Sequence, residues 1–270
     1  MKSRGSSGIH CRLPTYDYRL IGTDMSDYAV RIIRLNYTYP DGTKALEGID
    51  LDVAVGERIA IVGPSGAGKS TLLLHLNGVL EGIGSVRIMG LILDPSNLRQ
   101  IRKHVGLLFQ DPYDQLFCPT VFEDIAFGPM NLAVPESEIP RRVEKALSDT
   151  GLDYSFRSRT SHHLSLGERK RVSLATVLAM EPEILGMDEP TSNLDPRNRR
   201  HLIEVISGLK ATLIIATHDL ELVLDVCSRT VLMDRGKIWA DGETRSMLSD
   251  AQLMQAHGLE VPMSLKSGIR

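Results

Sequence analysis

The segment Gly63-Pro64-Ser65-Gly66-Ala67-Gly68-Lys69-Ser70-Thr71 fits the phosphate-loop pattern G-x-x-x-x-G-K-[ST] at every fixed position. The branched apolar residues 58–62 before it predict a buried strand, and residues 72–76 after it predict a helix. In such a setting backbone N–H groups bind phosphate oxygens, the lysine reaches the β- and γ-phosphates, and the hydroxyl after it ligates Mg²⁺. A glycine-rich turn that matches by chance is the alternative, and the correct flanking elements argue against it. We therefore expect this segment to bind a nucleoside triphosphate, with Lys69 on the phosphates and Ser70 on the metal.

The composition is that of an ordinary globular protein. The chain has 270 residues, 42% hydrophobic and 24% charged, which suits one large α/β domain or a core with a subdomain. A net charge of −3 argues against a nucleic-acid-binding protein held by a basic field. Cys11, Cys118 and Cys227 are odd in number and widely spaced, which is typical of a reducing cytosol and offers neither a disulfide framework nor a metal cluster. No uninterrupted apolar run reaches about 18 residues, so we expect no transmembrane helix.

The two ends of the chain differ from its middle. Residues 1–24 are polar, show little periodicity and lack the apolar core of a signal peptide, so we expect a poorly ordered extension, with Met25 as an alternative natural start. The main domain is predicted over residues 25–245. One or two short helices are expected in the tail, residues 246–270.

An antiparallel β-subdomain is predicted to lead into the phosphate loop. The branched segments 29–35 and 46–53 flank the turn sequence Tyr39-Pro40-Asp41-Gly42, in which Pro-Asp-Gly is a strong turn signal. Tyr39 lies at this turn, where its ring can stack on an adenine or simply pack on the sheet. The residues alone favour neither alternative.

Residues 111–165 are predicted to form a helical subdomain inserted in the core. Prolines recur there, and a helix is expected from about Ser137 to Thr150, with Gly151 as its stop. Most of its aromatic side chains are expected in the subdomain's own core, and some on a docking surface for a partner. These aromatic residues are Tyr113, Phe117, Phe122 and Phe127.

The segment Leu164–Glu168 opens a further helix, which is predicted to run to Met180. Ser165 and Glu168 have capping-box spacing, and apolar residues cover much of the helix surface, so the helix should be well buried. Its start is either only a well-capped helix end or a second anion site with Ser165 as a ligand. The basic run 169–171 is expected to lie on a solvated face without a catalytic role.

Polar groups follow three predicted strands. They are Gln110 after residues 105–109, Asp188 and Glu189 after residues 183–187, and His218 after residues 212–216. Because the carboxyl ends of parallel strands form one rim, where ligands bind, we expect these groups to meet beside the phosphate loop.

Each polar group at this rim suits one part of phosphoryl transfer. Asp188 can hold Mg²⁺, and Glu189 can orient or deprotonate the attacking water. The amide of Gln110 can reach the metal or that water, and His218 can contact the γ-phosphate. Gly186 interrupts the apolar run before Asp188, and the sequence offers no reason for it.

Taken in order, these motifs resemble the nucleotide-binding subunit of an ATP-binding-cassette (ABC) transporter over about residues 29–245. The motifs are Tyr39, Gly63–Thr71, Gln110, Leu164–Glu168, Asp188-Glu189, Ser192–Asp195 and His218. Segments 109–117 and 120–129 look like those of energy-coupling-factor ATPases, and segment 163–171 is similar to the cobalt/nickel branch. The resemblance implies a P-loop NTPase of the α/β class, with a parallel-sheet core, an N-terminal antiparallel β-subdomain and an inserted helical subdomain.

The same resemblance implies that two such subunits pair head to tail around two ATP molecules. The signature Leu164–Glu168 of one subunit then faces the phosphate loop of the other, so Ser165, Gly167 and Asp195 belong to the nucleotide site. Mg²⁺ is then held by Ser70, Gln110 and Asp188, while Glu189, His218 and Gln110 act in catalysis. The signature departs from the common Leu-Ser-Gly-Gly-Gln at Leu166 and Glu168, and the Leu166 side chain weakens close approach to nucleotide.

The resemblance further implies an ATP hydrolase on the cytoplasmic face of the cell membrane, which powers import of cobalt or nickel ions. Its expected partners are a second ATPase subunit, a membrane scaffold docked on the helical subdomain and a substrate-binding membrane component, with no nucleic acid. Import of a vitamin or another small solute is the first alternative. A soluble ATPase acting on DNA or ribosomes is the second, and a non-catalytic member of a heterodimer is the third. The sequence leaves a homodimer or a heterodimer open.

Overall fold

A six-stranded sheet carries the phosphate loop at its centre. The computed structural model describes residues 28–266, so the expectation for residues 1–24 lies outside the described part. The strand order is β10-β9-β3-β8-β7-β6, in which β10 alone runs antiparallel to its neighbour. These strands are β3 (Arg58–Val62), β6 (Val105–Leu108), β7 (Ile184–Asp188), β8 (Thr212–Ala216), β9 (Arg229–Asp234) and β10 (Lys237–Glu243). The five parallel strands are almost wholly buried, and their largely apolar sequences are typical of a sheet covered on both faces.

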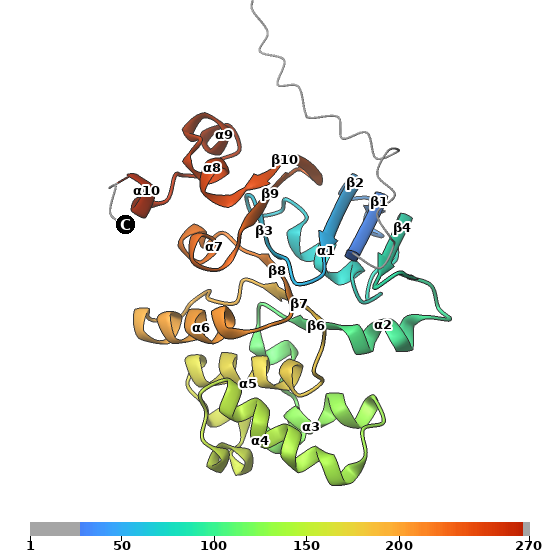
Figure 1. Cartoon of the computed structure of the whole chain (residues 1–270), viewed down its shortest axis with the longest axis vertical. Coiled ribbons are helices and arrows are strands. Elements are labelled where there is room, and N and C mark those ends of the chain that lie inside the picture. Colours follow the sequence, from blue (N-terminus) through green and yellow to red (C-terminus); the bar gives the residue numbers. More distant parts are fainter. Residues whose placement is uncertain (1–27, 267–270) are drawn as a thin grey trace, which may run out of the picture.

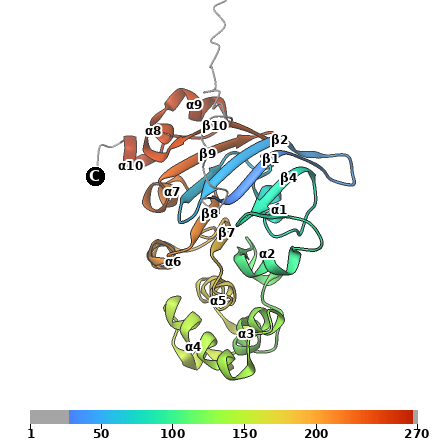
Figure 2. The same ribbon diagram turned by 45° about the vertical axis from the view of Figure 1, so that its right-hand side comes forward.

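A second sheet, antiparallel and four-stranded, has the order β2-β1-β4-β5 and confirms the predicted β-subdomain. Its strands are β1 (Tyr28–Thr38), β2 (Lys44–Ala54), β4 (Ile83–Ile88) and β5 (Leu91–Ile92). Helix α1 (Lys69–His75) lies between this sheet and the parallel one (Figure 2), and apolar residues of both sheets and of α1 form one continuous core. The phosphate loop is therefore held between two sheets.

Helices α3 (Val121–Asn131), α4 (Ile139–Asp149) and α5 (Leu166–Leu178) gather at one end of the molecule, away from the C-terminal helices (Figure 1). They share a hydrophobic cluster that extends from Leu116 to Ala179. This cluster reaches further along the chain than the expected 111–165, because α5 packs its apolar residues on α3 and α4. Short 3₁₀ turns connect the helices at Pro112–Asp114, Glu136–Glu138, Tyr154–Ser158 and Ser161–His163. We call this unit, residues 112–179, the helical region.

The prediction that most of the region's aromatic side chains lie in its core is wrong. Phe122 packs against the cluster, but Tyr113, Phe117 and Phe127 are 54%, 61% and 48% exposed. The buried face of α3 is formed by smaller apolar residues, Val121, Ile125 and Ala126 among them, which leaves the aromatic rings on the outside.

The remaining helices cover the sheet and its edge. They are α2 (Leu98–His104), α6 (Pro196–Gly208), α7 (Leu220–Val226), α8 (Thr244–Ser249), α9 (Ala251–Ala256) and α10 (Met263–Lys266). Residues from α5 to α9 form a core on the face of the parallel sheet opposite to α1. No helix within residues 28–266 combines the length and apolar character that crossing a membrane requires.

The structure explains Gly186, which the sequence did not. A Cβ atom at Gly186 would lie 2.6 Å from Leu107 Cδ2 and 3.4 Å from Leu73 Cδ2. The missing side chain thus lets the central strand β7 pack closely against its neighbours.

We predict that Gly186→Val destabilises the fold by about 1–3 kcal/mol, the usual cost of overpacking a core. Valine favours the extended backbone of a strand, so the loss would come from crowding and not from backbone preference. Thermal unfolding measures it. Gly208→Ala is the control, because no atom lies within 4 Å of a Cβ there, and its free energy of unfolding should change by less than about 0.5 kcal/mol. Equal melting temperatures for the wild type and Gly186→Val would contradict the prediction.

Candidate nucleotide-binding and catalytic site

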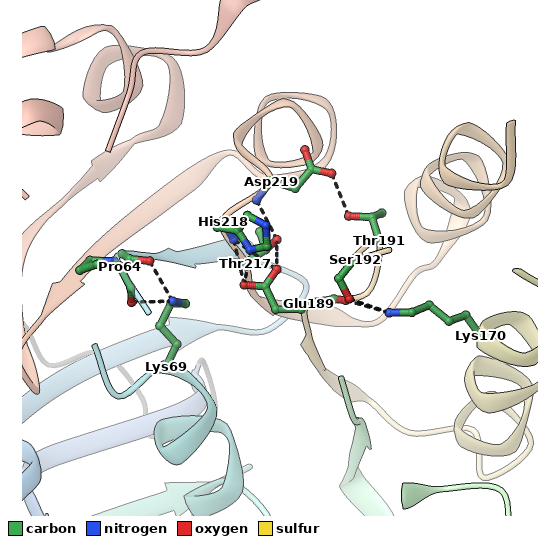
Figure 3. A network of polar contacts seen from close by, with 10 residues as sticks. Pro64, Lys69, Lys170, Glu189, Thr191, Ser192, Thr217, His218 and Asp219 are labelled. Carbon is green, nitrogen blue, oxygen red and sulfur yellow. Dashed lines mark hydrogen bonds and ion pairs between the residues drawn. The ribbon is translucent and has the colours of Figure 1, made fainter. Parts of the chain in front are cut away.

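The phosphate loop is a tight backbone ring between β3 and α1. Gly63, Gly66 and Gly68 have φ angles of 154°, 78° and 100°. At Gly63 a Cβ atom would lie 1.9 Å from the carbonyl oxygen of Met233, so only glycine fits. The Nζ atom of Lys69 folds back on this ring and donates to the carbonyl oxygens of Gly63 at 2.8 Å and Pro64 at 3.0 Å (Figure 3).

Lys69 is a buried charge at the carboxyl edge of the sheet, with 8% of its surface exposed. Burial lowers the pKa of its ammonium group, and the carboxylates of Glu189 and Asp188 act in the opposite direction. The buried charge of Lys69 is therefore favourable for binding an anion, and phosphate oxygens can accept strong hydrogen bonds from its ammonium group.

Asp188 ends β7 and faces Ser70. Its Oδ1 atom is buried without a hydrogen-bond partner, and burial raises the pKa of its carboxyl group, while a hydrogen bond with Ser70 lowers it. Gln110 follows β6, which pairs with β7 through Leu108 and Met187. An orphaned carboxylate oxygen beside a hydroxyl fits the hard oxygen ligands that Mg²⁺ prefers.

Glu189 has several hydrogen-bond partners that the sequence did not predict. It has 8% exposure and a left-handed backbone, with φ of 45°, which is strained for a residue with a side chain. Its carboxylate accepts from Thr217 Oγ1 at 2.9 Å, from the backbone N–H of His218 at 3.1 Å, and pairs with His218 Nδ1 at 2.8 Å (Figure 3). The carboxylate is thus fixed at the end of β7 before any substrate arrives.

His218 places its ring at the same edge, where its side chain is 69% exposed. The contact with Glu189 sets the orientation of the ring, so one imidazole nitrogen is engaged and the exposed ring faces solvent. A second hydrogen-bond network holds Asp219, the residue directly after His218. Asp219 accepts from Thr191 Oγ1 at 2.8 Å and from Arg199 of α6 at 2.7 Å.

Tyr39 and Asp195 have local partners. The hydroxyl of Tyr39 lies 3.0 Å from Thr71 Oγ1, and the Tyr37 ring meets the Tyr39 ring edge-on at 4.9 Å. The ring of Tyr39 therefore lies beside the phosphate loop and is half-buried. Asp195 caps α6 by accepting from two backbone N–H groups, and its hydrogen bonds with Asn198 lower the pKa of its carboxyl group. Their roles toward nucleotide stay predictions.

Ser165 forms the predicted capping box with Glu168. Its hydroxyl donates to Glu168 Oε2 at 2.7 Å, and its backbone N–H donates to the same oxygen at 2.8 Å. Ser165 opens onto a cavity of about 540 Å³ between α5 and α6, whose lining includes Arg171, Arg197 and Arg200. No phosphate-loop residue lines this cavity, so within the chain Ser165 opens on a surface separate from Lys69.

The expectation that residues 169–171 lie on a solvated face is wrong for two of the three. Arg169 and Lys170 are 7% and 4% exposed. The Nζ atom of Lys170 donates to the carbonyl oxygens of Gln110 and Glu189 and to Ser192 Oγ, and burial lowers its pKa to about 8. The signal was present in the sequence, because a helix that is apolar over most of its surface has no room for a solvated basic face.

The chain is similar to known ATP-binding proteins over most of its length. Residues 46–192 match the family model described as ABC transporter. A putative ABC transporter ATP-binding protein of Gloeobacter violaceus is 53% identical over 233 residues, which cover 86% of this chain and 96% of that protein. The energy-coupling factor transporter ATP-binding protein EcfA of Carboxydothermus hydrogenoformans is 45% identical over 242 residues, covering 88% and 89%.

Two solved structures have the same fold. The protein cbiO1 from Clostridium perfringens, part of the ABC transporter complex cbiONQ, is 36% identical with a TM-score of 0.75, over 90% of this chain and 99% of that one. The ATP-binding cassette MJ0796, solved as a dimer in a post-hydrolysis state bound to ADP and Pi, is 26% identical with a TM-score of 0.73, over 80% and 99%.

We predict that Asp188→Asn raises the melting temperature of the nucleotide-free protein at neutral pH, because it removes a poorly compensated buried carboxylate. The expected scale is about 2–4 °C per kcal/mol for a chain of this size. A carboxyl group whose pKa is higher in the folded than in the unfolded chain costs stability as the pH rises through that interval. The advantage of Asp188→Asn should therefore shrink as the pH falls to the ordinary carboxyl range. The same variant should lose most of the Mg²⁺-dependent stabilisation by ATP, and full retention of it would remove Asp188 from the metal site.

Proposed function

This chain belongs to the ABC transporter family of ATP-binding proteins, and from that premise we propose that it is the ATP-hydrolysing subunit of an energy-coupling-factor importer for cobalt or nickel ions. The observation that carries the catalytic part is the carboxylate of Glu189, held at the strand end by Thr217 and His218. Such a preset acceptor suits a water that must be oriented for attack on the γ-phosphate.

The residues of this site divide the work of phosphoryl transfer among them. Lys69 exchanges the carbonyl oxygens of the loop for phosphate oxygens, and its charge stabilises the negative charge that develops during transfer. Glu189 accepts a hydrogen bond from the attacking water, and His218 contacts the γ-phosphate from the exposed side of the site. Ser70, Gln110 and Asp188 would hold Mg²⁺, which supplies further positive charge beside the phosphates.

Two copies of the nucleotide-binding fold complete the site in the proposed assembly. Within one chain Ser165 opens on a separate basic cavity and not on the phosphate loop. A head-to-tail pair brings the Ser165 end of one subunit to the phosphate loop of the other, which gives both anion sites a use. The dimeric MJ0796 cassette supports such pairing by similarity.

The helical region supplies the proposed surface for the membrane scaffold. Phe117 and Phe127 are exposed and form an edge-to-face pair with ring centres 5.0 Å apart. Met130, on the same helix as Phe127, is 59% exposed. Exposed apolar side chains of this size are typical of a protein interface. We place the protein peripherally on the cytoplasmic face of the membrane through this contact.

The ion is assigned by resemblance of the signature segment, residues 163–171, to the cobalt/nickel branch. The similarity to cbiO1 and to the EcfA proteins supports the importer class. Purification of the tagged chain from detergent-solubilised membranes of its host tests the assignment, with identification of the proteins that accompany it. A membrane scaffold and a metal-binding component would support it, and a vitamin-binding component would replace the ion but keep the mechanism. Recovery with ribosomes or DNA alone would overturn transport.

We predict that Glu189→Gln binds ATP with nearly unchanged affinity and hydrolyses it at least about 100-fold more slowly, the usual contribution of a positioned acid or base. Equilibrium binding and phosphate release measure the two effects. Glu183→Gln is the matched control, since Glu183 directly precedes the opposite end of the same strand and pairs with His104 at 2.7 Å. Turnover of Glu189→Gln near that of the wild type would remove Glu189 from catalysis.

We predict that Phe117→Ser combined with Phe127→Ser lowers co-purification of the membrane scaffold by at least about tenfold, because buried aromatic anchors dominate interface energies. ATP binding by the isolated chain should be unchanged. Ile83→Ser is the control, as Ile83 is 81% exposed on β4, outside the helical region. Unchanged recovery of the scaffold with the double variant would show that docking uses another surface.

A further inference from the structure

Lys170 is a buried cation that the catalytic scheme above does not use. It lies on the first turns of α5, on the side that faces the parallel sheet, with 4% of its surface exposed. A lysine in such a place loses its hydration and is retained only where acceptors replace water. The acceptors that Lys170 contacts therefore indicate the role of its buried charge.

The three acceptors of Lys170 come from two segments, the residue after β6 and the loop after β7. The Nζ atom lies 3.3 Å from the carbonyl oxygen of Gln110, 3.1 Å from that of Glu189 and 2.9 Å from Ser192 Oγ. Figure 3 shows the side chain reaching from its helix across to the loop that carries Ser192 and Glu189. The ammonium group, which has three N–H donors, is thereby fully engaged.

Lys170 donates to the carbonyl oxygen of Glu189, a residue whose backbone is strained. Glu189 has φ of 45°, and its peptide is held by its own N–H, which donates to Ala216 O at 2.8 Å, and by its carbonyl oxygen. That carbonyl accepts from Ser192 Oγ at 2.9 Å as well as from Lys170. Strained backbone persists only where surrounding contacts over-determine it. Within residues 28–266, Glu189 accepts one hydrogen bond from the helical region, and Lys170 donates it.

We propose that Lys170 is a positioning residue for ATP hydrolysis. Its ammonium group ties helix α5 to Gln110, Glu189 and Ser192 and so fixes the position of the catalytic carboxylate relative to the helical region. A displacement of α5 then moves the strand-end loop through one ammonium group. The proposal rests on the role proposed for Glu189 and adds a specific link between that residue and the region assigned to the membrane partner.

The test compares Lys170→Met with Arg169→Met in the full chain, purified with its partners. Both variants remove a buried cation from the same helix, and Arg169 likewise bonds three carbonyl oxygens. Those of Arg169 belong to Ser161, His162 and Leu164, all in the segment just before α5 and none at the strand end. Loss of folding stability should therefore be similar for the two variants.

Lys170→Met should lower kcat for ATP by about tenfold or more, with KM for ATP changed by less than about twofold, because the contact positions the reacting group and does not bind nucleotide. Arg169→Met should keep kcat within about threefold of the wild type at temperatures below both melting transitions. If Lys170 had only a structural role, Lys170→Met would lower the melting temperature but would not lower kcat at unchanged KM.

Ser192→Ala sharpens the comparison. If Lys170 and Ser192 hold the carbonyl oxygen of Glu189 as a unit, the double variant loses less kcat than the product of the single losses. Independent effects would contradict the link.

The outcomes separate this inference from the proposed function. Loss of turnover in Glu189→Gln with normal kcat in Lys170→Met would overturn the positioning role alone. Normal turnover in Glu189→Gln would overturn the catalytic assignment on which it rests. Equal losses of kcat in Lys170→Met and Arg169→Met would assign the effect to general damage of α5 and also overturn the proposal.

Discussion

Charged side chains are buried at the carboxyl edge of the parallel sheet, and the surrounding elements are arranged to compensate them. Lys69, Lys170 and Glu189 are each less than one-tenth exposed, and Asp188 beside them holds an unpaired oxygen. Ions removed from water are costly unless partners replace the lost hydration. The structure replaces it with backbone carbonyl oxygens for the two lysines and with hydroxyl, imidazole and N–H groups for Glu189.

The sheet topology makes this compensation possible. Strands β3, β8, β7 and β6 run parallel side by side, so the segments that follow them meet at one edge. The loop after β3 provides Lys69, the end of β7 provides Asp188 and Glu189, and the end of β8 provides Thr217 and His218. Glu189 has a left-handed backbone, and its hydrogen bonds with Thr217 and His218, which follow β8, offset that strain.

The helical region connects the proposed partner surface with the residues at the strand ends of the core. It carries the exposed aromatic pair at its surface and the buried Lys170 at its base, so one packed cluster of helices links the proposed partner surface to the proposed catalytic residues. The capping box at Ser165 gives the same helix a fixed start beside a basic cavity. A single packed unit thus carries the surface proposed for the membrane partner, the helix start proposed to face the second subunit, and the contact with the strand-end loop.

Sequence patterns were enough to predict the phosphate loop, the β-hairpin before it, the strands of the core and the capped start of α5. These features depend on residues close together in the chain, where a glycine pattern, a turn or apolar periodicity is enough to specify them. The sequence also identified Gln110, Asp188, Glu189 and His218 as groups at strand ends. The partners of Glu189, the exposure of Phe117 and Phe127, and the reason for Gly186 could be seen only in the folded chain. The same holds for Lys170, whose three acceptors lie 60, 19 and 22 residues away along the chain. Such contacts form between elements brought together by packing, and local periodicity carries no record of which distant carbonyl oxygens a buried cation will meet.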